Sequence, residues 1–483
     1  MLASMLISAF TLIPIPNKVT VSGGVCSDTN VLNKVVFSYD DAIPREGYRL
    51  SVSPSSIAVV SSDETGAFYA QKTLSQLCLN DRVPCVVIED APAFRWRGFL
   101  LDEGRHFFGK ETVLHVLDLM ADYKLNVFHW HLTEDQGWRL AIDPFPELVE
   151  YGAVRSQSVS YDPAAEGRME LNGEKYGPFF YEAEDVREIV AYAKARHIVV
   201  VPEIEIPGHT RALLAAHPEF SCRGNLPREP RSGNGIEEDV LCAGNDAAIR
   251  YMERVYDAVC DLFPGAYVHI GGDECPKKRW KKCPKCQARM RELGLKDEEA
   301  LQGWLTAHFT EYLAHKGRHA IGWDEVLDGK PEPNTVIQSW RGEGAAAVKA
   351  AEAGHDVVVS SVAATYFSVS QGTDGDPFVY LNPRRRTRLR DTYGFDPAAR
   401  MPDTVRHHVL GAECCMWSEC TWNRFDLDFK MWPRALAFAE AVWTAPERRQ
   451  DFSDFESRAE LHRRRLVGRG VVCAPIQDFP GKK

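Results

Sequence analysis

From about residue 97 onward, apolar segments of strand length alternate with amphipathic segments of helix length. Eight segments have the length and apolar content of buried strands. They span residues 98–103, 126–132, 198–206, 266–274, 319–326, 335–340, 356–361 and 409–417. Helical stretches separate most of them, at residues 110–124, 183–197 and 343–354, and the last ends at Gly354 as at a helix C-cap. Eight such units predict a (β/α)8 TIM barrel, an α/β fold.

Polar and aromatic residues gather at the carboxyl ends of these segments. Barrel strands are buried on both faces, so polar side chains should be confined to the strand ends. The residues at or just past those ends are Asp102, His129, His131, Glu203, Glu205, Asp273, Glu274, Trp323, Asp324, Glu325, Trp340, Trp417 and Glu419. Because the active site of a barrel lies at that face, we expect one pocket to collect them.

The chain before the barrel has a different texture. Short strands at residues 48–53 and 56–62 are followed by a helical stretch at 64–77, which predicts a small α+β domain. We therefore expect four parts along the chain. They are a lead-in over residues 1–18 with a possible remnant of a signal peptide, the α+β domain over 19–92, the catalytic barrel over 93–446 and a helical tail over 447–483.

Two sequence-wide features bear on location and partners. Residues 1–16 form the longest apolar stretch, which is shorter than the roughly 20 residues of a membrane helix, so no membrane span is expected. They have the apolar centre of a secretory leader without a Lys or Arg start, and we expect a periplasmic or secreted protein. The net charge of −11 repels a phosphate backbone, which argues against nucleic acid as a partner.

Thirteen cysteines do not by themselves place the protein in a compartment. Cys222 and Cys242 flank a long polar segment that looks like a loop, which a disulfide could close. Cys78 and Cys85 flank a shorter loop in the same way.

A CxxC pair, Cys283 and Cys286, lies near Cys275 and could begin a zinc site. Such a site needs a fourth ligand at a matching spacing, and the sequence shows none. A local disulfide or free thiols are therefore the favoured interpretation.

Two adjacent carboxylates follow one of the predicted strands. Asp273 and Glu274 come directly after Gly271 and Gly272, which leave room for a ligand to approach the backbone. Two neighbouring carboxylates in a partly desolvated pocket cannot both ionise easily, so one should have a raised pKa and keep its proton. That is the requirement for a general acid. The alternative, a pair that binds a loop or a metal, is disfavoured by the position behind two glycines at a strand end.

His129 and His131 form a second motif, in which both side chains point to the same face of a strand. Such a pair occurs in metal-dependent barrel hydrolases, and His209, His269 and Asp324 could complete a zinc or iron site. The many aromatic residues around the pocket suit a neutral, ring-shaped ligand better than a metal-bound water. The other alternative for each histidine is a structural role with its hydrogen bonds satisfied.

Three of the eleven tryptophans, Trp323, Trp340 and Trp417, occur at the ends of three different strands. One such residue would fit a core, but three at one barrel mouth indicate the walls of a sugar pocket, since sugars present apolar C–H faces. Sugar hydroxyls need paired donors and acceptors, for which Arg105 and Glu419 at the same face are suited. The pocket is predicted to bind a saccharide.

Seven motifs in chain order resemble those of glycoside hydrolase family 20, the β-N-acetylhexosaminidases. They are RGFLLDEGRHFF, NVFHWHLTEDQGWR, VPEIEIPGHT, HIGGDECPKKRW, IGWDEVL, SWRG and GAECCMWSE. The resemblance extends from about residue 12 to 445, and the first domain resembles the α+β domain that precedes the barrel in that family.

The resemblance implies that the substrate supplies the nucleophile: the 2-acetamido oxygen closes on the anomeric carbon and forms an oxazolinium intermediate. Glu274 would be the general acid and would later activate water, and Asp273 would bind the acetamido N–H. His209 and Glu134 would form a relay that tunes the proton affinity of Glu274.

The expected substrate-binding residues are Arg105, His131, Trp323, Trp340, Tyr366, Ser368, Trp417 and Glu419. By the resemblance, Tyr366 holds the acetamido carbonyl and the three tryptophans enclose the methyl group and the ring. Arg105 and Glu419 would bind the O3 and O4 region.

Two positions depart from the family pattern. Glu134 stands where the family often has Asp, which keeps the charge and leaves only the relay geometry open. Ser368 stands where many relatives have an Asp that binds the sugar 6-hydroxyl. We expect that its neutrality admits a 6-sulfated GlcNAc, because a carboxylate there would repel the sulfate by a few kcal/mol at low effective dielectric. The alternative is that a water or Asp374 replaces the missing carboxylate.

These observations predict a retaining exo-β-N-acetylhexosaminidase that removes terminal GlcNAc, and GalNAc too, from glycans or chito-oligosaccharides without a metal or organic cofactor. Two alternatives remain open: a metal-dependent barrel hydrolase that uses His129 and His131, and a glycan-binding protein without activity. The presence of Glu274, Asp273 and Tyr366 together argues against the second.

Overall fold

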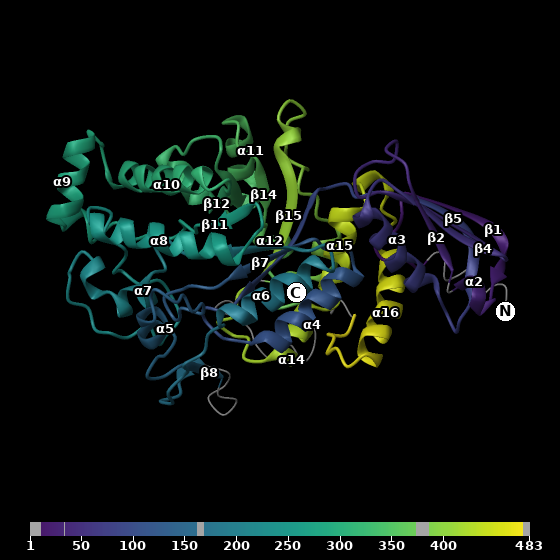
Figure 1. Cartoon of the computed structure of the whole chain (residues 1–483), viewed down its shortest axis with the longest axis horizontal. Coiled ribbons are helices and arrows are strands. Elements are labelled where there is room, and N and C mark those ends of the chain that lie inside the picture. Colours follow the sequence, from purple (N-terminus) through teal and green to yellow (C-terminus); the bar gives the residue numbers. More distant parts are fainter. Residues whose placement is uncertain (1–10, 33, 162–168, 373–385, 477–483) are drawn as a thin grey trace, which may run out of the picture.

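A closed, eight-stranded parallel barrel surrounded by helices dominates the computed structural model, which describes residues 11–32, 34–161, 169–372 and 386–476 (Figure 1). Around the barrel the strands follow the order β10 (Val199–Glu203), β11 (Tyr267–His269), β12 (His319–Trp323), β13 (Val336–Ser339), β14 (Val357–Val359), β15 (Val409–Met416), β6 (Trp96–Asp102) and β7 (Val127–His131). All eight predicted segments overlap a barrel strand, so the predicted (β/α)8 fold is confirmed.

Helices cover the outside of the barrel (Figure 1). They are α4 (Lys110–Asp122), α5 (Glu147–Gly152), α6 (Ala183–Lys194), α7 (Arg211–Ala216), α8 (Asp246–Leu262), α9 (Pro284–Leu293), α10 (Glu298–His315), α11 (Ala345–Glu352), α12 (Val362–Thr365), α13 (Leu389–Tyr393), α14 (Arg424–Met431) and α15 (Arg434–Trp443), followed by α16 (Phe452–Gly468) near the C-terminus. Between β12 and β13 the chain forms only a 3-10 turn, η4 (Asp324–Gly329). Gly354 follows α11 at φ 89°, which confirms the predicted glycine stop.

The N-terminal sheet lies at one end of the molecule, beside the barrel domain (Figure 1). Its strand order is β1 (Lys18–Cys26), β5 (Val83–Asp90), β3 (Tyr48–Ser53), β4 (Ser56–Ser61) and β2 (Val35–Tyr39). Its single long helix, α3 (Glu64–Leu77), begins where Asp63 accepts a hydrogen bond from the Gly66 N–H. Two short elements complete the described structure, α2 (Thr29–Leu32) and the hairpin of β8 (Val159–Tyr161) and β9 (Met169–Leu171). Buried ion pairs join the sheet to the barrel, among them Lys124 with Asp90 at 3.1 Å.

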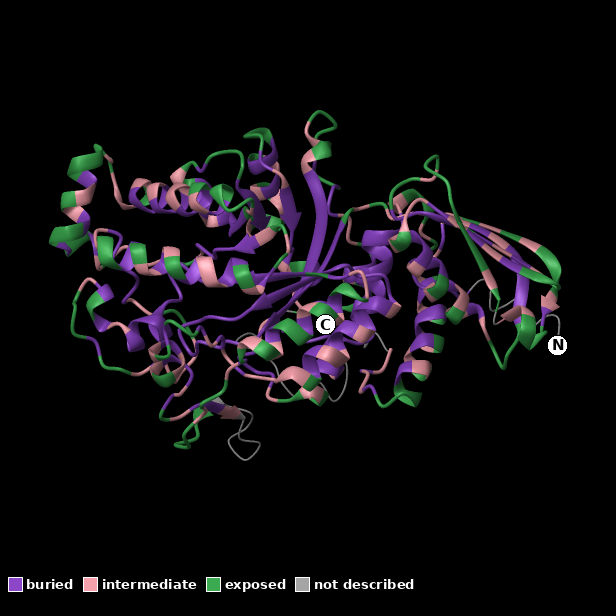
Figure 2. Cartoon of the chain, in the orientation of Figure 1, coloured by how far each residue is buried: buried purple, intermediate pink, exposed green. Residues whose placement is uncertain are grey.

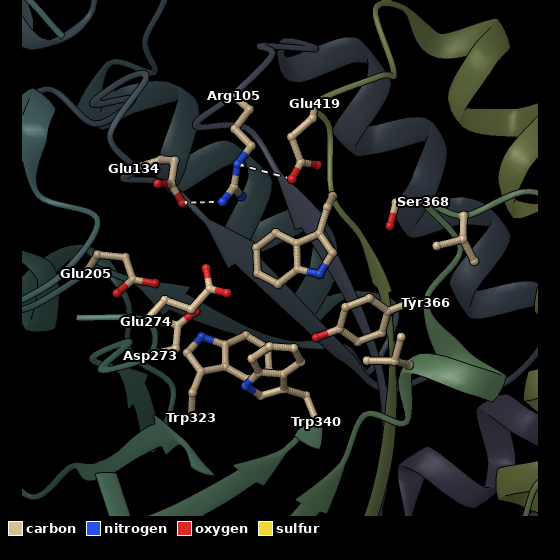
Figure 3. Close-up of a pocket in the computed structure, with 13 residues that line it drawn as sticks. Arg105, Glu134, Glu205, Asp273, Glu274, Trp323, Trp340, Tyr366, Ser368 and Glu419 are labelled. Atoms are coloured by element: carbon tan, nitrogen blue, oxygen red, sulfur yellow. Dashed lines mark ion pairs between the residues drawn. The ribbon is translucent and has the colours of Figure 1, made fainter. Parts of the chain in front are cut away.

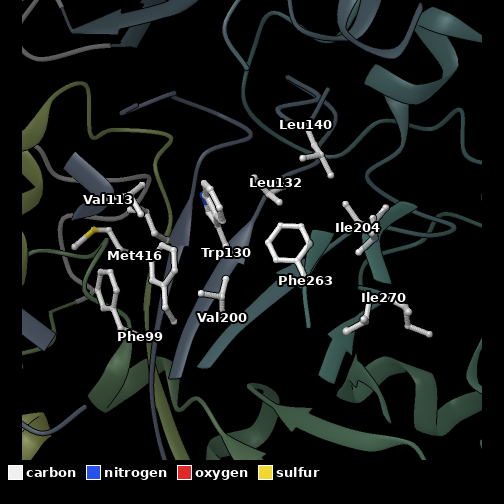
Figure 4. Close-up of a cluster of buried hydrophobic side chains, with 14 of the residues drawn as sticks. Phe99, Val113, Trp130, Leu132, Leu140, Val200, Ile204, Phe263, Ile270 and Met416 are labelled. Atoms are coloured by element: carbon white, nitrogen blue, oxygen red, sulfur yellow. The ribbon is translucent and has the colours of Figure 1, made fainter. Parts of the chain in front are cut away.

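The main hydrophobic core lies between the barrel strands and the helices around them (Figures 2 and 4). Phe99, Trp130 and Met416 project outward from strands into it and are fully buried. The barrel interior below the pocket, by contrast, is partly polar: His129, Glu203, His269, Gln338 and Glu413 are all buried there. The expectation that polar residues are confined to strand ends is therefore wrong for this layer, where the polar groups bond to one another instead.

The apolar N-terminal stretch is only partly described. The first ten residues of the expected leader lie outside the described residues, whereas residues 11–16 pack into the fold. Leu12 and Ile13 are buried, and Arg458 donates a hydrogen bond of 3.0 Å to the Leu12 carbonyl. None of the helices in the described part of the chain has the length and apolarity that crossing a bilayer requires.

All thirteen cysteines fall within the described residues, and none of them forms a disulfide there. The proposed bridges of Cys222 with Cys242 and of Cys78 with Cys85 are therefore absent from the structure. The chain instead brings Cys222 and Cys242 beside the CxxC pair of Cys283 and Cys286. The sequence showed no fourth ligand for the CxxC pair, and the structure brings two further thiols to it, from cysteines that lie more than forty residues earlier in the sequence.

Candidate active site

Asp273 and Glu274 lie on a loop whose backbone conformation requires glycine at the two preceding positions. Strand β11 ends at His269, and Gly271 and Gly272 then adopt φ angles of 68° and 100°. A Cβ on Gly271 would lie 1.7 Å from Oε2 of Glu205. The chain therefore passes directly over Glu205 and presents Asp273 and Glu274 to the pocket (Figure 3).

Asp273 and Glu274 differ in their surroundings. The Asp273 side chain is 13% exposed and that of Glu274 is 36% exposed. Burial, with further contributions from the carboxylates of Glu203 and Glu274, raises the pKa of Asp273 to about 6 against the opposing effect of His209. The sequence predicted a raised pKa within the pair, and it is found for Asp273, the more buried member.

His209 and Glu134 come together behind this pair, as the sequence predicted. The His209 Nδ1 lies 2.6 Å from Oε1 of Glu134, and its Nε2 lies 3.6 Å from an oxygen of both Asp273 and Glu274. Although burial opposes it, the charges of Glu134 and Asp273 raise the pKa of His209 well above its usual value. The ring is thus a buried cation between two sets of carboxylates.

Glu134 also pairs with Arg105, whose Nη2 lies 3.0 Å from its Oε2. Burial alone raises the pKa of the Glu134 carboxyl, but Arg105 and His209 hold it well below its usual range. Glu134 therefore keeps a charged carboxylate in contact with His209.

Aromatic rings form the wall opposite the carboxylates (Figure 3). Trp323 and Trp417 have ring centroids 5.7 Å apart, and the Tyr366 ring lies 6.3 Å from Trp417 and 6.4 Å from Trp340. The Trp323 indole N–H donates to Glu203 at 2.8 Å. All four predicted aromatic residues line one pocket, with orientations fixed by packing and hydrogen bonds.

Asp324 and Glu325 hold this wall in place. Asp324 accepts hydrogen bonds from the backbone N–H groups of Trp340 and Arg341 at 2.9 and 3.0 Å. Glu325 accepts the Trp340 indole N–H at 3.0 Å. Burial, with the charges of Asp273 and Asp324, raises the pKa of Glu325 to about 8. Both residues support the loop that carries Trp340.

Arg105 and Glu419 meet at the side of the pocket away from Trp340 (Figure 3). The Arg105 Nε lies 3.6 Å from Oε1 of Glu419, and its guanidinium stands 5.1 Å from the centre of the Trp417 ring. Nη1 of Arg105 lies 3.1 Å from Oδ2 of Asp102, and this ion pair holds the guanidinium in place. Oε2 of Glu419 is buried without a hydrogen-bond partner among the described residues, so it is available to a ligand hydroxyl.

His131 does not reach the pocket, which corrects its predicted place among the substrate-binding residues. It is fully buried, with Nδ1 2.5 Å from Glu203 and Nε2 3.2 Å from Glu134. Although burial opposes it, these partners raise the pKa of His131 to about 10. Burial also lowers the pKa of His129, but the charges of Glu413 and Glu203 outweigh it and raise this pKa to about 9. Both histidines therefore have buried carboxylates as hydrogen-bond partners, as the structural alternative expects.

Glu205 is a pocket residue to which sequence reasoning gave no role. It is 2% exposed, and its Oε2 has no hydrogen-bond partner among the described residues. Burial and the charges of Asp273 and Glu203 raise the pKa of Glu205 well above its usual range, so it holds a proton beside Asp273. The available signal was the alternation in VPEIEI, which places Glu203 and Glu205 on one side of the strand.

Ser368 lines the same pocket and is 5% exposed. Asp374, the alternative for its missing carboxylate, lies outside the described residues. The whole pocket measures about 520 Å³. Asp273 Oδ1 and His209 Nε2 are further buried atoms without a hydrogen-bond partner in the described chain. An apolar wall facing unsatisfied polar atoms is the arrangement expected for a sugar ring.

Comparison with known proteins agrees with this geometry. Residues 94–446 match the family model described as glycosyl hydrolase family 20, catalytic domain, and residues 25–91 match domain 2 of that family. A beta-hexosaminidase of Porphyromonas gingivalis is 40% identical over 468 residues, covering 93% of this chain and 57% of that protein. A beta-hexosaminidase of Vibrio furnissii is 36% identical, covering 84% of this chain and 66% of its own length. This chain thus spans less than two thirds of both relatives.

Solved structures show the same fold. A GH20 exo beta-N-acetylglucosaminidase from Vibrio harveyi, in complex with N-acetylglucosamine, superposes with a TM-score of 0.84 at 30% identity and covers 98% of this chain and 79% of that one. A beta-N-acetylhexosaminidase from Bacteroides fragilis gives a TM-score of 0.82 at 30% identity, with 96% and 97% covered.

Proposed function

The chain belongs to glycosyl hydrolase family 20, and from that premise we propose that it is a retaining exo-β-N-acetylhexosaminidase. Its substrates are glycans, glycoconjugates or chito-oligosaccharides that end in β-linked GlcNAc or GalNAc. The observation that carries the proposal is the placement of Asp273 and Glu274 opposite the aromatic wall, with His209 3.6 Å from both.

The first step breaks the glycosidic bond with help from the substrate. The 2-acetamido oxygen attacks the anomeric carbon while the carboxylic acid of Glu274 gives its proton to the departing oxygen. The aglycone leaves as an alcohol and the sugar remains as an oxazolinium cation. The Glu274 side chain is 36% exposed, so the departing oxygen of a bound substrate can reach its carboxyl group.

The second step restores the enzyme. The Glu274 carboxylate takes a proton from a water molecule, whose oxygen attacks the anomeric carbon and opens the oxazolinium ring. The product has the β configuration of the substrate because two inversions have occurred. This step regenerates the acid form of Glu274. His209, whose Nε2 lies 3.6 Å from Oε2 of Glu274, provides a fixed positive charge beside it.

Asp273 orients the nucleophile and stabilises its charge. Its carboxylate accepts the acetamido N–H, and it faces the positive charge that develops on the closing ring. Tyr366 donates its phenolic hydrogen to the acetamido oxygen from the other side of the pocket, and Trp323, Trp340 and Trp417 surround the methyl group and the sugar ring.

Arg105 and Glu419 hold the hydroxyls at O3 and O4. GlcNAc and GalNAc differ only in the orientation of O4, and a guanidinium beside a carboxylate offers both donors and an acceptor to either orientation. This pairing, 3.6 Å apart, supports the inclusion of GalNAc among the substrates.

Ser368 supports acceptance of a 6-sulfate. It lies in the pocket wall as a small neutral side chain, where a carboxylate would repel the anion. Of the acidic residues that line the pocket, Glu134, Glu205, Asp273 and Glu274 lie on the side away from Ser368 in Figure 3, and Glu419 lies nearer to it, paired with Arg105.

A kinetic panel tests the proposal and its alternatives. We expect turnover of the p-nitrophenyl β-glycosides of GlcNAc, GalNAc and 6-sulfo-GlcNAc, and none of the glucoside, which lacks the acetamido group. Glucoside turnover at a similar rate would overturn substrate assistance, and undetectable turnover of the sulfated compound would end the Ser368 hypothesis. Loss of initial rate on adding a chelator, in a chain that keeps its thermal stability, would favour the metal-dependent alternative. Export, which we also propose, is tested by fractionating the cells that make the protein.

A further inference from the structure

Four cysteine sulfurs meet at the edge of the barrel, far from any role in the proposed reaction. Cys222 and Cys242 lie at the two ends of a loop after α7, and Cys283 and Cys286 lie at the start of α9. Three of the four are buried and Cys222 is half-buried. All four sulfurs lie within 4.8 Å of one another.

The spacing of these sulfurs matches a tetrahedral metal site. Cys222 and Cys286 are 3.8 Å apart, Cys242 and Cys283 are 3.7 Å apart, and Cys242 and Cys286 are 3.6 Å apart, measured between sulfurs. Metal–sulfur bonds of about 2.3 Å in a tetrahedron place the sulfurs about 3.8 Å from each other. A disulfide would require about 2.05 Å.

The CxxC pair lies at the N-terminal end of a helix and among lysines. Cys283 occupies the N-cap position of α9, and Cys286 lies in the first turn, where the helix dipole favours negative charge. Lys281, Lys282 and Lys285 surround the CxxC pair in sequence. Their charges oppose the net charge of −2 that four thiolates and one divalent cation carry.

The backbone is also shaped to bring the two pairs together. A Cβ on Gly244 would lie 2.2 Å from the carbonyl carbon of Lys285 and 2.5 Å from the Cys286 nitrogen. Glycine at this position therefore lets the chain after Cys242 touch the turn between Cys283 and Cys286.

We propose that Cys222, Cys242, Cys283 and Cys286 bind one structural Zn²⁺ ion. Four thiols lose their protons as four zinc–sulfur bonds form, and no redox change is involved. Four protein ligands leave no open position for water or substrate, so the ion stabilises the fold and takes no part in hydrolysis.

The ion holds together α9 and the loop from Cys222 to Cys242. Helix α9 buries only Cys286 and Met290 of its own, and it projects at the edge of the molecule (Figure 1). The loop from Cys222 to Cys242 reaches back to the residue after Glu134: the Arg231 and Glu237 backbone N–H groups each donate to Asp135 at 2.9 Å. Zinc removal is expected to loosen this loop.

Metal analysis of the purified full chain tests the proposal, with purification that uses no metal resin. We expect inductively coupled plasma mass spectrometry to find about one zinc per chain in the wild type. The same zinc content is expected in Glu274→Gln, so the result does not depend on catalytic activity. Cys242→Ser should lose the zinc, whereas Cys473→Ser, a half-buried cysteine outside the cluster, should keep it. Modification of the four thiols should release the zinc to a metal-sensitive dye.

Growth with Co²⁺ in place of zinc gives a second measurement that needs no variant. We expect the visible ligand-field bands of tetrahedral Co²⁺ and its thiolate charge-transfer absorption. A wild-type chain that contains no zinc and whose intact mass shows two disulfides would overturn the proposal. Four freely reactive thiols without metal, or iron as the bound metal, would overturn it as well.

Discussion

His209 Nε2 lies 3.6 Å from a carboxylate oxygen of Glu274 while its Nδ1 lies 2.6 Å from Glu134. The ring is buried and both of its nitrogens face negative charge, so it remains a cation at neutral pH. His209 thus lies between Glu134, in the buried charged layer of the barrel, and Glu274, the proposed general acid. The chemistry of the site therefore depends on groups below the pocket as well as on those that line it.

Replacing Glu274 with Gln should lower kcat about 10²- to 10⁴-fold, because it removes general acid catalysis. The loss should be larger for chito-oligosaccharides than for the p-nitrophenyl glycoside, since p-nitrophenolate leaves without protonation. The unfolding free energy should change by less than about 0.5 kcal/mol, because the side chain is 36% exposed. Glu184→Gln, at a side chain 85% exposed, is the control. Unchanged turnover in Glu274→Gln would support a glycan-binding protein instead.

The value of kcat/KM should fall as the pH drops below about 6, the pKa of Asp273 in the free enzyme. Asp273 binds the acetamido N–H as a carboxylate, and its folded-state pKa is raised above the ordinary value, so protonation begins at a higher pH than for an exposed Asp. A pH profile with p-nitrophenyl GlcNAc measures this limb. A limb near pH 4 would show that another group controls it.

The same raised pKa has the opposite effect on stability. The folded chain takes up a proton at Asp273 before the unfolded chain does, so this group favours the folded state most at low pH and loses that contribution as the pH rises through about 6. As the pH rises through about 6, kcat/KM should therefore increase while the contribution of Asp273 to the free energy of unfolding decreases.

Gly271→Ala should destabilise the fold by about 2–4 kcal/mol, since the new Cβ meets Glu205 in addition to straining the backbone. Gly317→Ala is the matched control: its φ of 71° is close to the 68° of Gly271, and its Cβ would meet no atom within 4 Å. That variant should lose only about 1–2 kcal/mol. Chemical denaturation measures both, and equal losses would mean that the contact with Glu205 is unimportant.

Ser368→Asp should lower the turnover of 6-sulfo-GlcNAc about 10- to 100-fold relative to GlcNAc, corresponding to a repulsion of roughly 1.4–3 kcal/mol between charges a few Å apart. Ser368→Asn has nearly the same size without the charge and should retain the wild-type ratio. The ratio of kcat/KM for the two p-nitrophenyl substrates is the measurement. An unchanged ratio in both variants would place the 6-position elsewhere.

The barrel could be predicted because its strands are continuous apolar runs whose ends carry polar residues. The polar interior layer could not, since Glu203 and Glu413 neutralise histidines that come from other strands. His131 looked like a ligand-binding residue in the sequence because the strand pattern gives the face of a side chain and not its depth. Burial is likewise what raises the pKa of Asp273, and the sequence does not show how deeply this side chain is buried.

The cysteine cluster shows the same limit at longer range. The CxxC pair was visible in the sequence, but its partners Cys222 and Cys242 depend on how a loop folds back against α9. Glu205 was visible as a charge in a strand, yet its role as the neighbour of Gly271 required the backbone course after β11.

The most direct test of substrate assistance varies the nucleophilicity of the acetamido oxygen itself. A series of p-nitrophenyl GlcNAc substrates would carry none, one, two or three fluorines on the acetyl methyl group, which weaken that oxygen with little change in shape. The proposed mechanism predicts a steep fall in kcat/KM along the series, because this oxygen attacks the anomeric carbon. A kcat/KM that stays flat across the series would contradict it and would mean that another nucleophile attacks.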